Sequence, residues 1–186
     1  MAQALGAERT GQNRPERTTM RSEVEVKQAL QTHADTVRRI CFMHLNNRSD
    51  VEDIFQEVFL KYLLHEAEFE SHDHERAWLL RVAINACKDL NKSLWRRRIS
   101  SLEDADLTHL SLSDGNRDVL DAVLRLVPPK YRDVIYLYYY EGYKASEIAA
   151  ILGQKENTIY TWLTRAREQL KQTLGGESLE SDTRRV

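Results

Sequence analysis

Basic, amide and aromatic side chains recur between residues 76 and 98 at spacings that place them on one side of a helix. At roughly 100° per residue, they fall within about one third of the helix surface. This cationic stripe consists of Trp78, Arg81, Asn85, Lys88, Lys92, Trp95 and Arg96. Lysine and arginine bind phosphates, and aromatic rings stack on unpaired bases. The stripe therefore predicts a single-stranded nucleic acid as its partner.

Apolar residues fill the rest of the same helix, from Leu79 to Leu94. Because they complete a buried face by themselves, we expect the stripe to be free to bind a partner. A solvated cationic face is the ordinary alternative for a run of charges, and Trp78 taken alone favours core packing.

An acidic block precedes the stripe. Nine carboxylates lie between residues 50 and 75 with Lys61 as the single base, whereas seven bases lie between residues 76 and 98 with Asp89 as the single acid. The formal net charge of the whole chain, -2, hides this contrast. Adjacent blocks of opposite sign indicate two surfaces with different partners.

Helical periodicity predicts the elements that carry these blocks. Apolar residues recur at three- and four-residue steps from Val24 to Leu45 and again from Val51 to Leu63, where Asp50 is the expected N-cap. The polar, aperiodic segment from Phe69 to His74 predicts a loop, and a third helix is expected from Arg76 to Arg98.

A second group of helices follows a segment rich in serine and aspartate. Helices are expected before and after Pro128-Pro129, with Gly142 ending the second of them. Two more are expected over residues 144–152 and 156–174, with Gly153 as the left-handed turn of a helix-turn-helix. No strand pattern occurs in the sequence. We therefore expect an all-α fold of two small helical domains joined by a flexible linker, the C-terminal one a helix-turn-helix.

The expected boundaries follow from these shifts in composition and period. They are a disordered arm over residues 1–22, a first domain over 23–98, a linker over 99–116, a second domain over 117–175 and a tail over 176–186.

The last predicted helix has one apolar and one polar side. Its apolar side, with Ile159, Leu163, Ala166 and Leu170, is expected in the core. An ordinary αα-hairpin with a solvated charged face is one interpretation of the polar side, and entry into a major groove is the other. The polar side chains are Asn157, Tyr160, Thr161, Thr164, Arg167 and Glu168, with Arg165 on the flank.

The sequence also limits the class of protein. No run approaches the roughly 18 apolar residues of a membrane span, and residues 1–23 lack the apolar centre of a secretory signal. Cys41 and Cys87 lie in apolar-periodic stretches, which favours buried thiols in a reducing compartment over a disulfide. We therefore expect a cytoplasmic protein.

Three segments occur in a recognisable order: DVEDIFQEVFLKY, RAWLLRVAINACKDL and LVPPKYRDVIYLYYYEGYKASEIAAILGQKENTIYTWLTRAREQL. Together they resemble the RNA polymerase sigma factors of the extracytoplasmic-function group, over roughly Val24 to Leu174. The resemblance implies that residues 23–98 are sigma region 2, which binds core polymerase and melts the minus-ten element. Residues 117–175 would be sigma region 4, which recognises the minus-thirty-five element. The resemblance implies no enzymatic activity and no cofactor.

The resemblance also implies roles for individual residues. The acidic helix would dock on the clamp helices of the polymerase largest subunit through Asp50, Asp53, Gln56 and Glu57. The following loop would hold a base flipped from the minus-ten element, and the stripe would hold the unwound strand. The residues implied are Phe69, Glu70, Ser71, His72, Trp78, Arg81, Asn85, Lys88, Lys92, Arg96, Arg97 and Arg98. Melting by strand capture fits this arrangement, because stacking and hydrogen bonds offset the cost of extruding a base.

The implied minus-thirty-five residues lie on the last helix. Tyr160 and Trp162 stand where the family often has basic residues, so we expect more stacking and fewer ionic contacts there. The implied partners are core RNA polymerase, including its flap, promoter DNA and an anti-sigma factor, which in the family is often membrane-bound; no small-molecule substrate is implied. The residues are Asn157, Thr158, Tyr160, Thr161, Thr164, Arg165 and Arg167.

Two other classes of function compete with this interpretation. A stand-alone helix-turn-helix regulator would need an apolar pocket or a dimer face in residues 24–98, where the sequence offers charged surfaces. A metal-dependent enzyme would need a ligand set, and the chain has no metal-binding motif of typical spacing. The best candidates for such ligands are Glu52, Asp53 and Glu57, or His72, Asp73 and His74.

Overall fold

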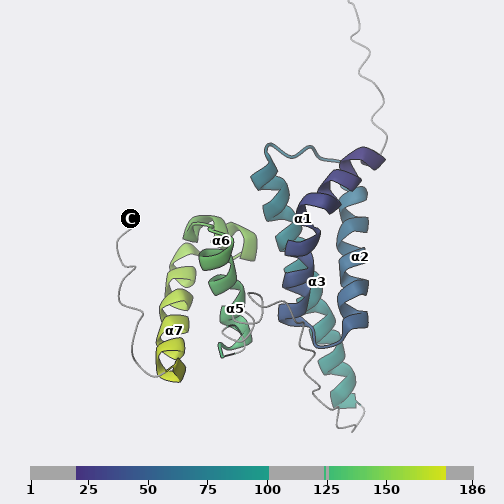
Figure 1. Cartoon of the computed structure of the whole chain (residues 1–186). Coiled ribbons are helices and arrows are strands. Elements are labelled where there is room, and N and C mark those ends of the chain that lie inside the picture. Colours follow the sequence, from purple (N-terminus) through teal and green to yellow (C-terminus); the bar gives the residue numbers. More distant parts are fainter. Residues whose placement is uncertain (1–19, 101–123, 125, 175–186) are drawn as a thin grey trace, which may run out of the picture.

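The computed structural model describes residues 20–100, 124 and 126–174 of the chain. All regular structure within these residues is helical, which confirms the expected all-α fold. Figure 1 shows two groups of helices next to each other. The N-terminal group contains α1 (Glu23–His44), α2 (Arg48–Leu63) and α3 (His72–Ser100). The C-terminal group contains α5 (Pro129–Ile135), the π-helical turn η1 (Tyr136–Tyr140), α6 (Ala145–Leu152) and α7 (Glu156–Leu174).

Three of the expected segments lie wholly or mainly outside the described residues. They are the arm up to residue 19, the linker from residue 101 onward and the tail from residue 175 onward. The helix expected before Pro128 is described only at Leu124, Leu126 and Val127, of which Leu124 and Val127 are buried.

The start of α1 is fixed by a capping box. Ser22 Oγ accepts from the Glu25 amide at 3.3 Å, and the Ser22 amide donates to Glu25 Oε2 at 2.8 Å. Hydrogen bonds from Ser22 lower the pKa of Glu25, which keeps this cap charged. The Arg21 amide donates to the Leu63 carbonyl oxygen at 2.9 Å. The expected disordered arm is therefore wrong at Arg21 and Ser22, because both are held by hydrogen bonds.

The cap of α2 differs from the expected one. Asn47 Oδ1 accepts from the Ser49 amide at 2.9 Å, so the helix begins at Arg48 and Asp50 lies within its first turn. Asparagine and aspartate cap helices equally well, and the earlier of the two takes the position here. The charge of Asp50 is still favourable, because it lies near the positive end of the helix dipole.

Helix α3 is longer than predicted at both ends. Ser71 Oγ accepts from the His74 amide at 3.1 Å, and the helix begins at His72 instead of Arg76. The predicted loop is therefore wrong for His72–His74, because a serine cap can start a helix before its apolar period begins. The cationic stripe consequently lies on one continuous helix that extends to Ser100.

The core of the N-terminal group forms where α1, α2 and α3 meet. Val37, Ile40, Val51, Val58 and Leu80 are all fully buried there. Cys41 and Cys87 are free and buried, as predicted. A hydrogen bond with Cys41, together with burial, raises the pKa of Cys87, so its thiol remains protonated.

The C-terminal group follows the predicted order of helices. Helix α5 begins directly after Pro128, and Gly142 (φ 76°) and Gly153 (φ 62°) both have the left-handed conformation expected of them. The turn η1 was not predicted: the Glu141 amide bonds to the Tyr136 carbonyl, one residue further back than in an α-helix. The predicted core face of α7 is buried at all four positions, Ile159, Leu163, Ala166 and Leu170.

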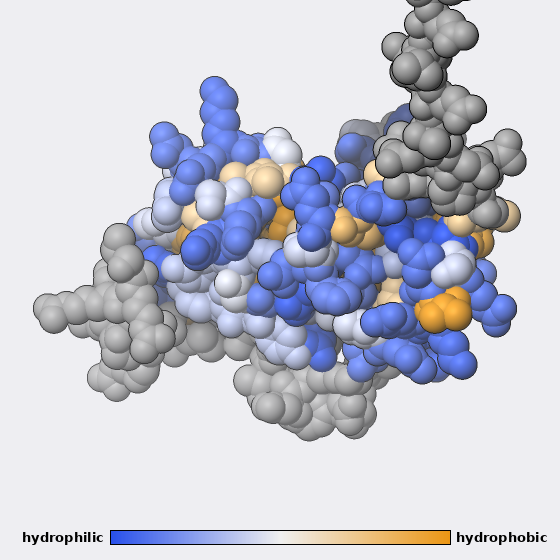
Figure 2. Space-filling model, turned by 90° about the horizontal axis from the view of Figure 1, so that it is seen from above, coloured by the Kyte–Doolittle hydropathy of each residue, from blue (hydrophilic) through white to orange (hydrophobic). Residues whose placement is uncertain are grey.

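The surface of the described chain is predominantly polar. Figure 2 shows that the face seen from above is mostly hydrophilic, with hydrophobic residues in small patches. Among the described helices, none has the length and apolar character needed to cross a membrane.

Candidate nucleic-acid interface

Helix α3 presents most of the cationic stripe to solvent. Arg81, Asn85 and Lys92 are exposed, and Trp95 is 65% exposed, whereas Lys88 is partly buried. Arg96 is also exposed, and Arg97 and Arg98 continue the helix with side chains outside the described residues. Trp78 is partly buried against the core, in line with the packing that its size favours.

An aromatic cluster joins α3 to the loop that precedes it. The ring of Trp78 lies 4.6 Å from His65 and 5.7 Å from Phe69, measured between centroids, and Phe69 stacks on Tyr62 at 6.0 Å. The Arg21 guanidinium covers Phe69 and Tyr62 at 4.5 and 4.7 Å. These contacts fix the loop backbone relative to α3, so the loop is held in place before any ligand binds.

A cavity of about 530 Å³ lies between α1 and residues 68–72, which form the end of the loop and the first residue of α3. Within its lining, the Tyr62 hydroxyl donates to Glu75, and His33 Nε2 lies 3.8 Å from Glu75 Oε2. Burial raises the pKa of Tyr62 and lowers the pKa of His33, so both groups are uncharged at neutral pH. Hydrogen-bonding groups next to aromatic rings suit a planar base. The carboxylates of Glu25, Glu68 and Glu70, which also line the cavity, disfavour a phosphate.

Acidic side chains of α2 form a separate, mostly exposed set. Asp53, Gln56 and Glu57 are exposed, and Asp50 is partly buried in the first turn. Glu57 pairs with Lys61 at 2.6 Å, an exposed i,i+4 contact of small energetic value. Leu60 is 55% exposed next to these carboxylates. An acidic face with an exposed leucine suits a basic, partly apolar protein surface better than DNA.

The polar side of α7 is exposed as predicted. Asn157, Tyr160, Thr161, Thr164, Arg165 and Arg167 are all exposed, whereas Thr158 is partly buried. The threonine hydroxyls donate back to the helix: Thr161 Oγ1 bonds to the Asn157 carbonyl at 2.8 Å, and Thr164 Oγ1 bonds to the Tyr160 carbonyl at 3.0 Å. Short polar side chains and flanking arginines on a helix after a tight turn are the arrangement that enters a major groove.

Comparison with known families assigns both groups of helices. The family model described as Sigma-70 region 2 matches residues 29–97, and the model described as Sigma-70, region 4 matches residues 117–170. The two regions occur in this order on one chain and together cover more than half of it. The chain belongs to the extracytoplasmic-function (ECF) group of sigma-70 factors.

Curated relatives are RNA polymerase sigma factors. The ECF RNA polymerase sigma factor SigE of Mycolicibacterium smegmatis is 30% identical over 159 residues, which are 80% of this chain and 61% of the relative. The RNA polymerase sigma factor SigV of Bacillus subtilis is 26% identical over 148 residues, which are 79% of this chain and 89% of the relative. This sigma factor therefore spans less than two thirds of the mycobacterial protein and most of the Bacillus protein.

Solved structures share the fold. The sigma factor RpoE from Bartonella quintana, in complex with the anti-sigma factor NepR, has a TM-score of 0.66 at 22% identity and covers 83% of this chain and 99% of its own. CnrH, in complex with the cytosolic domain of CnrY, has a TM-score of 0.58 at 22% identity and covers 84% of this chain and 92% of its own.

Part of the stripe of this sigma factor is already paired within the chain, contrary to the expectation from sequence that it is free. Lys88 Nζ lies 2.8 Å from Asp133 Oδ2, and Arg81 Nη2 donates to the Ala150 carbonyl at 2.6 Å. Lys92 Nζ lies 3.4 Å from Asp89 Oδ1, an exposed pair within α3. The expectation was wrong because it considered only how α3 fills its own buried face. It did not anticipate that α6 packs against α3 or that Asp133 of α5 reaches Lys88.

Sequence reasoning missed the carboxylates that pair with α3. Asp133 directly follows Arg132 and precedes the apolar residues from Val134 onward, so the local pattern does not mark it as a buried group. Glu141 and Arg21 carry no local signal either, because their partners Arg76 and Ala67 lie far away in the sequence. Within the described part of the chain, no cluster of three or more histidine, cysteine or acidic residues is arranged to hold a metal ion.

Proposed function

We propose that this sigma factor binds core RNA polymerase and directs it to promoters, where it recognises the DNA and melts it to start transcription. The observation that carries the proposal is the occurrence of the two sigma regions in order, each with a polar helix face exposed to solvent. In this proposal, residues 23–98 act as region 2, residues 99–116 as linker and residues 117–175 as region 4.

Binding to polymerase is assigned to the acidic face of α2. Asp53, Gln56 and Glu57 project into solvent, and Asp50 adds charge at the start of the helix. We assign the clamp helices of the polymerase largest subunit as their partner, and the flap as the partner of region 4. Complementary charge increases the association rate and orients the two proteins.

Melting is assigned to the loop and α3. Phe69, Glu70, Ser71 and His72 lie where the loop meets the cavity and would receive a base that has left the stack. The stripe on α3 would hold the phosphates of the unwound strand, and the ring contact of Trp78 with Phe69 would support the loop. Stacking and ionic contacts then offset the cost of unpairing, so no ATP is needed.

Recognition of the minus-thirty-five element is assigned to α7. Its N-terminal turns carry Asn157, Tyr160 and Thr161, and Thr164 and Arg165 follow on the same exposed side. We place Thr161, Thr164 and Arg165 at base edges or phosphates of the major groove. Tyr160, which is 54% exposed, adds stacking or van der Waals contacts.

The proposal includes neither a catalytic residue nor a cofactor, because polymerase supplies the chemistry. It places the protein in the cytoplasm, where polymerase and promoters are found. An anti-sigma factor is a further proposed partner, supported by the structure of RpoE in complex with the anti-sigma factor NepR.

Run-off transcription on genomic fragments tests the proposal. The reaction is assembled with core polymerase alone, with the sigma factor alone and with both. We expect discrete promoter-specific transcripts only when both are present. A stand-alone regulator would bind specific duplex DNA without core, and an absence of new transcripts with core would contradict the proposal.

A further inference from the structure

Two carboxylates of the C-terminal helices are buried against the N-terminal group. Asp133 on α5 is 1% exposed, and its two oxygens lie 2.6 Å from His44 Nε2 and 2.8 Å from Lys88 Nζ. The Glu141 side chain, which follows η1, is fully buried and pairs with Arg76 of α3. We call Asp133 and Glu141 the acidic latch. Each of them finds its cation in the other group of helices.

The latch is suited to a contact that opens and closes. Burial alone would raise the pKa of Asp133, but the hydrogen bond and charge of His44 and the charge of Lys88 outweigh burial and lower it. The carboxylate is therefore ionised at neutral pH and attracts α1 and α3. When the two groups of helices separate, water replaces these partners, so neither charge is left buried and unpaired.

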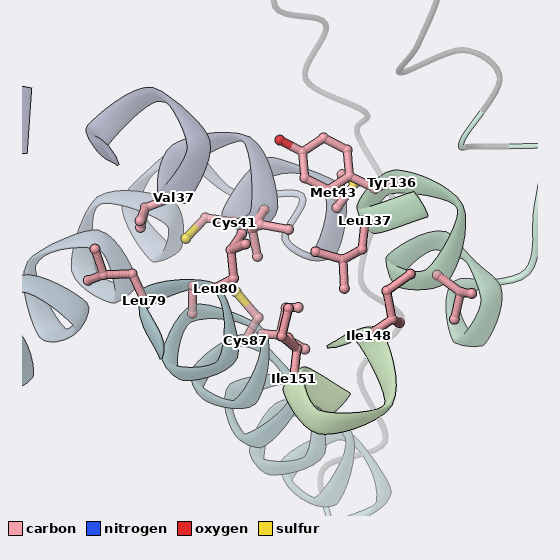
Figure 3. Close-up of a cluster of buried hydrophobic side chains, with 14 of the residues drawn as sticks. Val37, Cys41, Met43, Leu79, Leu80, Cys87, Tyr136, Leu137, Ile148 and Ile151 are labelled. Carbon is pink, nitrogen blue, oxygen red and sulfur yellow. The ribbon is translucent and has the colours of Figure 1, made fainter. Parts of the chain in front are cut away.

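Further contacts surround the latch on both sides. The Arg39 guanidinium covers the Tyr140 ring at 4.4 Å, and Arg81 donates to the Ala150 carbonyl oxygen. Figure 3 shows Leu137 and Ile151 of the C-terminal group in one buried cluster with side chains of α1 and α3. Interfaces between domains that move commonly have this mixture of polar and apolar contacts.

These contacts use groups that the proposed function assigns to DNA. The Lys88 ammonium cannot pair with Asp133 and at the same time hold a phosphate in that position, and the Arg81 hydrogen bond to Ala150 competes in the same way. Asn85 and Lys92 remain exposed, so the closed form covers one part of the stripe and leaves another accessible.

We propose that region 4 closes over α3 through the acidic latch when polymerase is absent, and that this closure excludes single-stranded DNA from the stripe. The inference rests on the proposed role of α3 in binding the unwound strand. Polymerase would favour the open form by engaging α2 and region 4 at separate sites. A ligand that binds only the open form shifts the equilibrium by its difference in affinity for the two forms.

The variants for the test lie outside the residues assigned to polymerase and DNA. Asp133→Asn with Glu141→Gln removes both latch charges at nearly constant volume. His44→Gln weakens the latch from the other side and serves if the double variant fails to fold. Glu168→Gln, on the exposed side of α7, is the control for the loss of one negative charge.

The first measurement is the distance between spin labels in the free full-length chain. Cysteines introduced at the exposed positions Lys27 and Gln172 carry the labels, since native Cys41 and Cys87 are buried and react poorly. We expect one narrow distribution for the unmodified chain and for Glu168→Gln, and a broad one extending to longer distances for the latch variants. A broad distribution in the unmodified chain would overturn the proposal, as would an unchanged narrow one in the latch variants.

The second measurement is binding of a fluorescein-labelled single-stranded DNA of mixed sequence at low salt. The latch variants should bind it roughly tenfold more tightly than the unmodified chain and Glu168→Gln do. If the distance distribution of the latch variants broadens but their affinity for single-stranded DNA does not rise, closure does not exclude DNA and the inference is overturned.

Run-off transcription with core polymerase separates this inference from the proposed function. One outcome would overturn the latch alone. In it, the unmodified chain gives promoter-specific transcripts, but the latch variants match it in spin-label distance and in affinity for single-stranded DNA. An absence of transcripts from the unmodified and the opened chains would overturn the proposed function, and the inference with it.

Discussion

Arg21 Nη2 donates to the Ala67 carbonyl oxygen at 2.7 Å, so the residue before the cap of α1 holds the loop that follows α2. The same guanidinium covers the rings of Tyr62 and Phe69. The loop proposed to receive the flipped base is thereby tied to the beginning of the described chain. Pre-organisation of this kind reduces the entropy lost on binding DNA.

Arg21→Ala should loosen this loop without unfolding the helices. The lost hydrogen bond and ring contacts should lower the free energy of local opening by about 2 kcal/mol. Hydrogen exchange of the loop amides measures the change directly. Arg38→Ala is the matched control, because Arg38 covers the Phe55 ring at 4.0 Å in another part of the N-terminal group. Equal protection of the loop in both variants would contradict the assignment.

Lys92→Glu should impair promoter opening and leave polymerase binding intact. Lys92 is suitable because its pair with Asp89 is exposed, whereas changing Lys88 would also break the contact with Asp133. A reversed charge in the proposed path of the unwound strand repels phosphates, and the loss of one phosphate contact should reduce the salt slope of single-strand binding by about 0.7. Lys27→Glu on α1 is the control. Normal opening by the Lys92 variant would exclude this residue from the DNA path.

Asp53→Lys should weaken the association with core polymerase by about tenfold at low salt, because it places a cation in the proposed contact with the clamp helices. Retention of core on the immobilised sigma factor measures the effect, and Glu23→Lys, an exposed acid on α1, is the control. Undiminished retention by the Asp53 variant would place the polymerase contact elsewhere.

Asp133→Asn should cost about 2 kcal/mol of stability at neutral pH, through the loss of the ionic hydrogen bonds with His44 and Lys88. The pKa of Asp133 is lowered in the folded chain, so its contribution is fully present above the ordinary value of 3.8 and is lost as pH falls through the lower folded value. Urea unfolding at a series of pH values checks this. The difference between the unmodified chain and the variant should shrink below the ordinary pKa, and a constant difference would contradict the ionic origin.

Local sequence patterns predicted much of the fold. The period of Ile159, Leu163 and Ala166 identified the buried side of α7, because a helix repeats its faces every 3.6 residues whatever its neighbours are. Gly142 and Gly153 marked the two left-handed turns for an equally local reason. The cap of α2 was misplaced because Asn47 and Asp50 are both good caps, and sequence alone does not rank them.

Contacts between the two groups of helices were beyond prediction from sequence. Lys88 and Asp133 lie in separate predicted domains, and neither the charge of the one nor the position of the other indicates the partner. The periodicity predicted the helix that carries the stripe and which of its residues are mostly exposed. It did not predict that Arg81 and Lys88 are paired with the other group of helices, since that depends on tertiary packing.

We expect the chain to open promoter DNA only together with polymerase. The most direct measurement of this opening is the permanganate reactivity of thymines near the start site of a promoter found by run-off transcription. Reactive thymines should appear when core polymerase and the sigma factor are both present, and should be absent with either one alone. Thymines that react with the sigma factor alone, or that stay unreactive in the complete mixture, would contradict the account.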